Sequence, residues 1–349
     1  MDFGFCTALY DLDLPGNLAK SKELGFSCLE VNAWTLFKRD KFEGGRNILP
    51  QHLEDDSLVE EIDRAIKDTG IYICCVHGPM QGVKLGDPDF DDKRYLYEAL
   101  LERMKRLNIK YLLHHAGNGN LGDFREGENK EMWKAIVGSL EKLRDLASAH
   151  GITLTVENGA GAQDLTHPRA LRKLFDALEG VYFSCDVHHA YRPQLFDYDE
   201  MFGEVGDRLV HLHVPDGDGF ISHGGIPGKC FIDWPHVMRL IRRTGFDGPA
   251  TIETDLRAFY YVLGYYLAMM KEEGIEEVYL PPVEYAPPNE YRYGPKDPEH
   301  TKLTPRFVQI PSAHIRLADR QDHAVDIHDA VILTAKKQLE RLWAESEGG

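Results

Sequence analysis

The chain has 349 residues, 43% of them hydrophobic, which is enough for one large domain or two ordinary ones with a sizeable core. Its formal net charge of −17 at pH 7, without a run of basic residues, argues against a nucleic-acid partner. No apolar run is long enough to span a membrane, and no basic and apolar leader follows Met1. We therefore expect a cytoplasmic protein with no membrane partner. Its six cysteines include no C-x-x-C pair, which predicts reduced thiols in the core.

Eight short apolar runs recur along the chain at near-even spacing, which predicts eight β-strands. The expected strands cover residues 2–8, 27–32, 71–77, 110–115, 152–157, 181–186, 209–214 and 249–254. Helix-like stretches separate them, such as residues 92–107 and residues 130–150, and Gly151 is a typical cap for the second of these. Eight successive βα units favour an α/β fold of the closed (β/α)8 TIM barrel type over a doubly wound open sheet.

The chain changes character after the eighth expected strand. Residues 256–273 carry apolar side chains at helical spacing and are expected to seal the barrel. Residues 280–311 are rich in proline and tyrosine, which predicts an arm without regular structure, and residues 324–343 carry one apolar stripe, which predicts a terminal helix. We therefore expect a barrel, residues 1–273, and a C-terminal extension of arm and helix, residues 274–349, that docks on the barrel or on a partner subunit.

Acidic residues and a histidine stand at the ends of the last four expected strands. Glu157 ends the fifth strand, Asp186 the sixth, His213 the seventh and Glu253 the eighth. Because catalytic groups of TIM barrels collect at the C-terminal ends of the strands, we expect these four side chains to lie together. Mixed oxygen and nitrogen ligands suit Mn²⁺, Mg²⁺, Co²⁺ or Zn²⁺, so the pattern predicts a divalent-metal site.

The stretch around the seventh expected strand is the most specific motif in the chain. It begins Val210-His-Leu-His-Val-Pro-Asp-Gly, continues from His223 to Trp234, and resembles the seventh-strand signature of the xylose-isomerase-like TIM barrel superfamily. Further resemblances lie in Val76-His77-Gly-Pro79, Glu157-Asn-Gly-Ala-Gly161 and Asp186-Val-His-His189. The resemblance, which covers about residues 1–273, implies either a sugar or sugar phosphate isomerase or epimerase, or an AP endonuclease of the endonuclease IV type.

In the isomerases and epimerases that the chain resembles, one divalent ion holds two adjacent oxygens of a ketose or sugar derivative. The resemblance implies that Glu157 and Glu253 remove and return a proton beside the carbonyl, through an enediolate, while also binding the ion. Asp186 and His213 would mainly hold the ion, for which Mn²⁺ is our first expectation.

Five further residues are expected to contact the substrate. They are His77, His115, His189, His223 and Trp34. Since successive residues of a strand point to opposite faces, His114 is expected to point away from the barrel centre when His115 faces it. By the same reasoning, His213 is expected to face the barrel centre and His211 is expected to point away from it.

Two alternatives to sugar isomerisation stay open. The endonuclease pattern lacks one ligand here, because Ile221 stands where that pattern has an aspartate, and the loops of the expected rim are not basic. A weaker resemblance is to the large chain of C-glycoside deglycosidases, which act as C–C lyases on 3-keto C-glycosides together with a small second subunit; the Pro/Tyr-rich arm keeps this alternative open. We expect a small-molecule sugar substrate and a homo-oligomer, with a small second subunit as a further partner under the lyase alternative.

Overall fold

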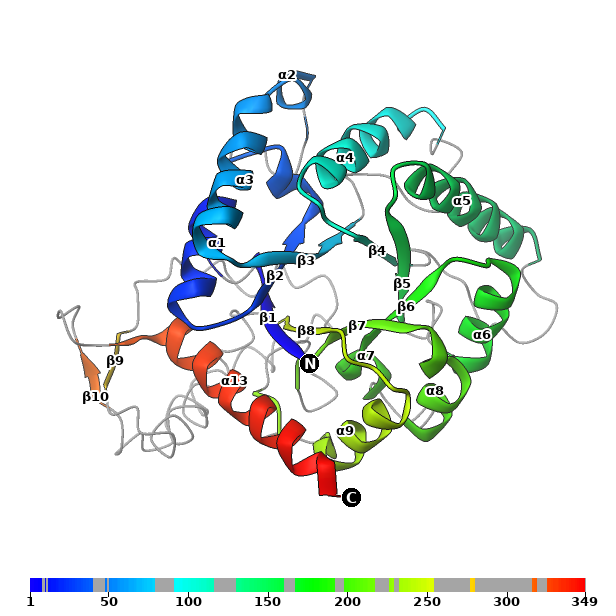
Figure 1. The fold of residues 1–349 in the computed structure, drawn as a ribbon. Coiled ribbons are helices and arrows are strands. Elements are labelled where there is room, and N and C mark those ends of the chain that lie inside the picture. The colour runs from blue at the N-terminus through cyan, green and yellow to red at the C-terminus, as the bar shows by residue number, and fades with distance from the viewer. Residues whose placement is uncertain are drawn as a thin grey trace, which may run out of the picture.

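The computed structural model describes residues 1–7, 10, 12–39, 48, 50–78, 91–115, 130–159, 167–191, 198–216, 226–228, 232–253, 277–279, 316–318 and 325–348. Eight parallel strands form a closed barrel in chain order, with the eighth strand paired to the first (Figure 1). Their bounds are β1 (Asp2–Cys6), β2 (Cys28–Asn32), β3 (Tyr72–His77), β4 (Tyr111–His115), β5 (Thr153–Glu157), β6 (Tyr182–Asp186), β7 (Leu209–His213) and β8 (Pro249–Ile252). The predicted TIM barrel is confirmed, and each predicted strand overlaps an observed one.

Helices surround the barrel and cover its strands (Figure 1). Their bounds are α1 (Leu14–Glu23), α2 (Pro50–Leu53), α3 (Asp56–Thr69), α4 (Arg94–Arg106), α5 (Lys130–Ala149), α6 (Pro168–Ala177), α7 (Val187–Tyr191), α8 (Tyr198–Val205), α9 (Trp234–Arg243) and α13 (Ile327–Glu345), with short 3-10 turns η2 (Ala33–Leu36), η5 (Gly206–Arg208) and η9 (Ser346–Gly348). Aspartates cap several of them; Asp13 accepts a 2.8 Å hydrogen bond from the amide of Gly16 in α1. Gly151 follows α5 with a φ of 75°, the left-handed conformation expected of a helix cap.

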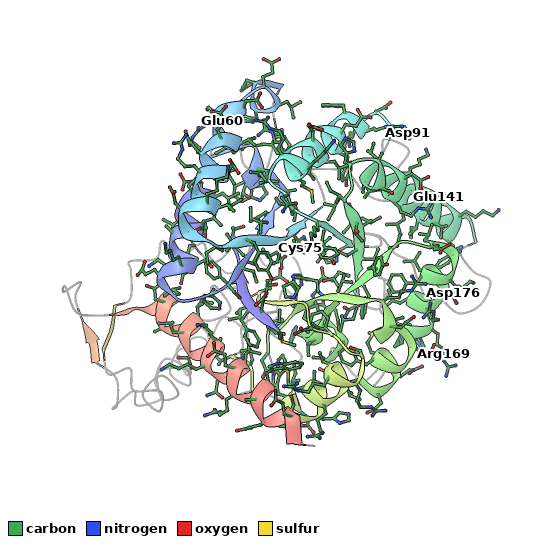
Figure 2. All side chains as sticks on the ribbon, viewed as in Figure 1. Glu60, Cys75, Asp91, Glu141, Arg169 and Asp176 are labelled. Atoms are coloured by element: carbon green, nitrogen blue, oxygen red, sulfur yellow. The ribbon has the colours of Figure 1, made fainter. Side chains whose placement is uncertain are left out.

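The apolar core lies between the strands and the helices. It contains side chains such as Phe5, Val156, Phe183 and Leu212, which are wholly shielded from solvent. Charged side chains such as Glu60 of α3 and Glu141 of α5 project outward from the helices, whereas Cys75 lies near the barrel centre (Figure 2). The described cysteines are all buried and none of them is in a disulfide, and Cys230 lies outside the described residues.

Helix α13 takes a place in the outer ring between α1 and α9 (Figure 1). On one side Lys336 donates a 2.7 Å hydrogen bond to the carbonyl of Gly25, just past α1. On the other side the guanidinium of Arg242 in α9 stacks on Trp343, 3.7 Å from the ring centroid, and donates to the Trp343 carbonyl at 2.6 Å. The C-terminal helix expected at residues 324–343 is therefore present and packs on the barrel.

A small parallel sheet precedes α13 in the chain. Its strands are β9 (Glu277–Tyr279), β10 (Arg316–Ala318) and β11 (Val325–Asp326), in the order β10-β9-β11. The sealing segment expected at residues 256–273, the arm expected at residues 280–311 and the expected boundary between residues 273 and 274 lie outside the described residues. Among the helices that the structure describes, none has the length and apolar character to cross a membrane.

Candidate metal centre and active site

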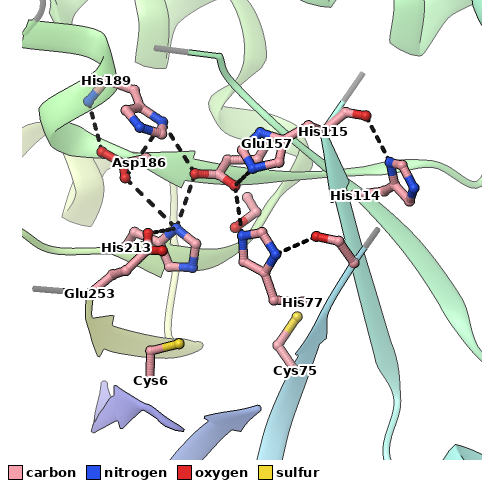
Figure 3. A network of polar contacts seen from close by, with 12 residues as sticks. Cys6, Cys75, His77, His114, His115, Glu157, Asp186, His189, His213 and Glu253 are labelled. Atoms are coloured by element: carbon pink, nitrogen blue, oxygen red, sulfur yellow. Dashed lines mark hydrogen bonds and ion pairs between the residues drawn. The ribbon is translucent and has the colours of Figure 1, made fainter. Parts of the chain in front are cut away.

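Four side chains from neighbouring strand ends converge on one point (Figure 3). One ligand atom from each of Glu157, Asp186, His213 and Glu253 lies within 4.8 Å of the others. The Nδ1 atom of His213 is 3.1 Å from a Glu157 oxygen, 3.2 Å from a Glu253 oxygen and 3.8 Å from an Asp186 oxygen. Ligands that each lie about 2.0–2.3 Å from one ion have similar separations from one another, so these residues fit a divalent cation.

The barrel register brings these residues to one rim. Asp186 on β6 pairs with His213 on β7, and His115 on β4 pairs with Glu157 on β5. Glu253 directly follows β8, where it is 26% exposed, while the side chains of the other three ligand candidates are shielded from solvent. Because every strand runs in the same direction, residues that end consecutive strands meet at the same face of the barrel.

Asn158 connects the ends of β5 and β6 through hydrogen bonds. Its side-chain amide donates a 2.9 Å hydrogen bond to the carbonyl of Asp186, and its side-chain oxygen accepts a 2.8 Å hydrogen bond from the amide of Asp186. The amide of His189 donates a 2.7 Å hydrogen bond to the Asp186 carboxylate. These bonds fix one oxygen of Asp186 toward the backbone and leave the other facing His213. The sequence analysis gave Asn158 no role, although it follows Glu157 directly in the motif.

The carboxylates and histidines of the site shift one another's pKa values. Burial raises the pKa of Glu157, but nearby His115, His213 and His189 outweigh it, so that pKa lies well below its usual value. Burial lowers the pKa of His213, but Glu30, Glu253 and Glu157 outweigh it and raise that pKa well above its usual value. A cluster of ionised carboxylates that draws protons onto buried imidazoles is also suited to a divalent cation, which would replace that positive charge.

Residues 18–277 match the model of the family described as xylose isomerase-like TIM barrel. The chain belongs to this family. It is 27% identical over 133 residues to fructoselysine 3-epimerase of Shigella flexneri, a match that covers 35% of this chain and 45% of that protein. The match therefore spans less than half the length of this curated relative.

Solved structures of other proteins share the barrel. A D-psicose 3-epimerase of Clostridium cellulolyticum H10, crystallised with D-tagatose, superposes with a TM-score of 0.59 at 19% identity, over 73% of this chain and 85% of that one. An IolI protein with a bound zinc atom superposes with a TM-score of 0.60 at 16% identity, over 99% of each chain. At these identities the likeness shows the fold shared by members of the xylose isomerase-like family.

Two of the expected substrate contacts border the second oxygen of Glu157 in this family member. The Nε2 atoms of His77 and His115 each lie 3.3 Å from Glu157 Oε2. Burial lowers the pKa of both rings, but Glu157 outweighs it at His77 and raises that pKa to about 9, whereas the pKa of His115 falls to about 4. Without a cation, the pKa of His77 therefore lies above neutrality and that of His115 lies below it.

The other expected contacts have different surroundings. His189 is 6% exposed, and its Nδ1 lies 3.2 Å from Glu157. Burial lowers its pKa, but Asp186 and Glu157 outweigh burial and raise that pKa to about 9. Trp34 lies half-buried in η2, and the structure describes no contact between it and the four converging side chains. His223 lies outside the described residues, so its role and that of Trp34 stay predictions.

The expectation for His114 is confirmed and that for His211 is wrong. His114 faces the helices, where its Nε2 lies 2.8 Å from the hydroxyl of Tyr97 in α4. His211 faces the barrel interior like His213, because residues two apart in a strand point to the same side. Its Nδ1 lies 2.8 Å from the Ser184 hydroxyl, one layer below the rim.

The same lower layer contains a buried carboxylate to which the sequence analysis gave no role. Glu30 on β2 is wholly buried and accepts a 2.5 Å hydrogen bond from the hydroxyl of Thr251 on β8. The same Glu30 oxygen lies 2.8 Å from Nε2 of His213. A signal was present in the sequence: a charged residue stands inside the otherwise apolar run Cys28-Leu-Glu-Val31.

Proposed function

We propose that this chain is a divalent-metal-dependent sugar isomerase or epimerase that moves a proton at a carbon beside a carbonyl. The observation that carries the proposal is the pair Glu157 and Glu253, at the ends of strands β5 and β8, which both lie within 3.2 Å of the same His213 nitrogen. Epimerases among the relatives and solved structures support it. Two carboxylates at one cation site are the groups that removal and return of a carbon-bound proton requires.

Glu157, Asp186, His213 and Glu253 would hold the cation. A divalent cation at this point supplies polarisation of the substrate carbonyl, which makes the adjacent C–H bond more acidic. We propose Mn²⁺ first, because three carboxylates and one imidazole form a mostly oxygen ligand set, with Mg²⁺, Co²⁺ and Zn²⁺ as alternatives.

The two glutamates divide the proton transfers. Glu157, whose pKa lies well below its usual value, is ionised and accepts the proton as the C–H bond breaks. In an epimerisation Glu253, protonated from solvent, would donate a proton to the opposite face of the same carbon, and Glu157 would release its proton to solvent. In an isomerisation Glu157 would return its proton to the neighbouring carbon, and a hydroxyl proton would move to the former carbonyl oxygen. One proton leaves carbon and one arrives, so the reaction needs no oxidant or reductant.

The histidines around Glu157 would orient the substrate. His77 and His189 both lie beside Glu157, and their imidazole N–H groups can donate hydrogen bonds to hydroxyl or carbonyl oxygens of a sugar. Asn158 and the amide of His189 keep Asp186 in place. Buried groups therefore hold the side chains of the site in fixed positions before a substrate binds, and such preorganisation favours catalysis.

Solvent deuterium exchange tests the proposal. The metal-loaded protein is incubated in D₂O with a panel of ketoses and ketose derivatives, and deuterium on carbon is measured by mass spectrometry. We expect incorporation with the wild type, and a loss of about 100-fold or more in Glu157→Gln and Glu253→Gln.

Glu60→Gln on exposed α3 is the matched control and is expected to exchange like the wild type. No exchange by the wild type with any metal of the set would contradict the proposed reaction. Exchange retained in the Glu157 and Glu253 variants would reject the roles given to these two residues.

One observation favours a second candidate, an endonuclease IV-like zinc phosphodiesterase. His77 and His115 both face Glu157 Oε2 at 3.3 Å, an arrangement that offers ligands for another cation. The net charge of −17 opposes it, because a phosphate backbone would be repelled. Incision of abasic-site DNA in the presence of Zn²⁺ would decide for the nuclease.

The remaining expectations are proposals with simple tests. The arm that keeps the lyase alternative open lies outside the described residues, and incubation with a 3-keto C-glycoside tests this alternative. Mass in solution tests the proposed homo-oligomer and any small second subunit. Cell fractionation tests the proposed cytoplasmic location.

A further inference from the structure

The two ring nitrogens of His213 face different surroundings. Nδ1 faces the carboxylates of Glu157, Glu253 and Asp186 at the rim of the barrel. Nε2 faces downward and lies 2.8 Å from Oε2 of Glu30, a residue 183 positions earlier in the chain. Both His213 and Glu30 are wholly shielded from solvent, so bulk water does not reach this contact.

The geometry points to Glu30 as the positioning residue of His213: its carboxylate accepts the Nε2–H hydrogen bond and thereby presents the lone pair of Nδ1 to the cation. This inference rests on the metal-dependent function proposed above. A neutral imidazole has one donor nitrogen and one acceptor nitrogen, and an ionised carboxylate can only accept. A carboxylate next to Nε2 therefore selects the form of the ring in which Nδ1 is free to bind a metal.

Glu30 is itself held at a fixed place by the barrel interior. The Thr251 hydroxyl donates to Glu30 Oε2 at 2.5 Å, and the ring of His211 approaches the same oxygen at 3.3 Å. His211 is in turn fixed by Ser184, and the barrel register pairs the backbone positions of Ser184 and His211. Strands β2, β6, β7 and β8 thus all contribute to the position of one carboxylate oxygen.

The other oxygen of Glu30 argues for a functional role. Oε1 is buried, and the described residues offer it no hydrogen-bond partner. A buried carboxylate oxygen without a hydrogen bond destabilises a barrel core, because the carboxylate loses its hydration on folding. An apolar side chain of similar size would avoid this cost. The contact that makes Glu30 useful is the one to His213, directly beneath the metal centre.

The experiment measures metal affinity, independently of any substrate. Metal-stripped wild type, Glu30→Gln, Glu30→Leu and Thr155→Val are titrated with Mn²⁺ and with Zn²⁺ by calorimetry. Thr155 is the matched control, because it is a wholly buried polar residue of β5, two positions before Glu157, with a described hydrogen bond to the Leu112 carbonyl at 3.3 Å. We expect both Glu30 variants to bind about 10- to 100-fold more weakly than the wild type, and Thr155→Val to bind like it.

A spectroscopic readout separates positioning from general loss of packing. In the Zn²⁺-loaded protein with ¹⁵N-labelled histidine, we expect a hydrogen-bonded Nε2–H signal from His213 in the wild type and in Thr155→Val. The signal is expected to shift or broaden in Glu30→Gln and Glu30→Leu. Glu30→Gln has nearly the same shape as the native side chain, so it decides the question if Glu30→Leu does not fold.

The outcomes distinguish the two proposals. If the wild type binds none of the divalent cations, the proposed function fails and the role of Glu30 fails with it. If the wild type binds one cation and both Glu30 variants bind it equally well with an unchanged His213 signal, only the positioning role is overturned. The wild type could also bind a second cation that neither Glu30→Gln nor His211→Asn binds. That result would overturn the positioning role, because Glu30 would then be a metal ligand itself.

Discussion

The hydroxyl of Tyr10 donates a 2.8 Å hydrogen bond to Asp329, a residue 319 positions later in the chain. The second oxygen of the same carboxylate lies 3.1 Å from the ammonium group of Lys20 in α1. The contact is largely shielded from solvent, since the Asp329 side chain is 13% exposed. Helix α13 is therefore fixed to the first βα unit by a buried, charge-assisted contact.

Loss of this contact is expected to destabilise the protein without weakening metal binding. Asp329→Ala leaves the Tyr10 hydroxyl and the Lys20 ammonium group without this partner, which should lower the free energy of unfolding by about 1–3 kcal/mol. Urea denaturation followed by circular dichroism measures the change. Glu345→Ala, an exposed position on the same helix, is the control. A destabilisation of equal size in both variants would contradict the role of the Asp329 contact.

His114 is expected to make stability depend on pH. Burial lowers its pKa to about 4 from the ordinary 6.5, and the neutral ring donates through Nδ1 to the His115 carbonyl while accepting from Tyr97 at Nε2. Between these two pKa values the unfolded chain binds more protons than the folded one. The free energy of unfolding contributed by His114 therefore falls as pH drops from 6.5 to 4, by up to about 3 kcal/mol.

Denaturation at several pH values measures this contribution. In His114→Gln, which keeps a donor and an acceptor, we expect a shallower fall in the free energy of unfolding between pH 6.5 and pH 4 than in the wild type. His167→Gln, at an exposed position, should keep the wild-type slope. Equal slopes in all three proteins would show that His114 does not titrate in this range.

Asn158 is expected to matter for metal affinity although it offers no ligand. Asn158→Ala removes both hydrogen bonds that tie the ends of β5 and β6, so Asp186 loses its fixed orientation. We expect divalent cations to bind about tenfold more weakly. Calorimetric titration measures this, with Thr155→Val as the control. An unchanged affinity, in a variant that stays folded, would mean that His189 alone suffices to orient Asp186.

The sequence was a reliable guide to the barrel strands and to the rim. Strands of a parallel barrel are covered by helices, so they read as continuous apolar runs such as Ile73 to Val76, and the polar residue that follows marks the strand end. Because all strands run in one direction, Glu157 and Asp186 could be placed at the same face before any coordinates were known.

The layer beneath the rim could not be predicted in the same way. Glu30 meets His213 only because closure of the barrel brings β2 and β7 to face each other across its interior, and no local pattern reports such a contact. The position of α13 is a similar case. Its apolar stripe predicts a helix, but the choice of α1 and α9 as neighbours depends on tertiary packing.

The place of α13 in the ring has a consequence for biosynthesis. A ribosome that has delivered all eight barrel strands has not yet delivered α13, because that helix starts at Ile327 whereas β8 ends at Ile252. Throughout that interval the flanks of α1 and α9 that α13 later covers stay open to water. Nascent chains should be most vulnerable to chaperone capture and to self-association then, and packing of α13 between α1 and α9 should end that exposure.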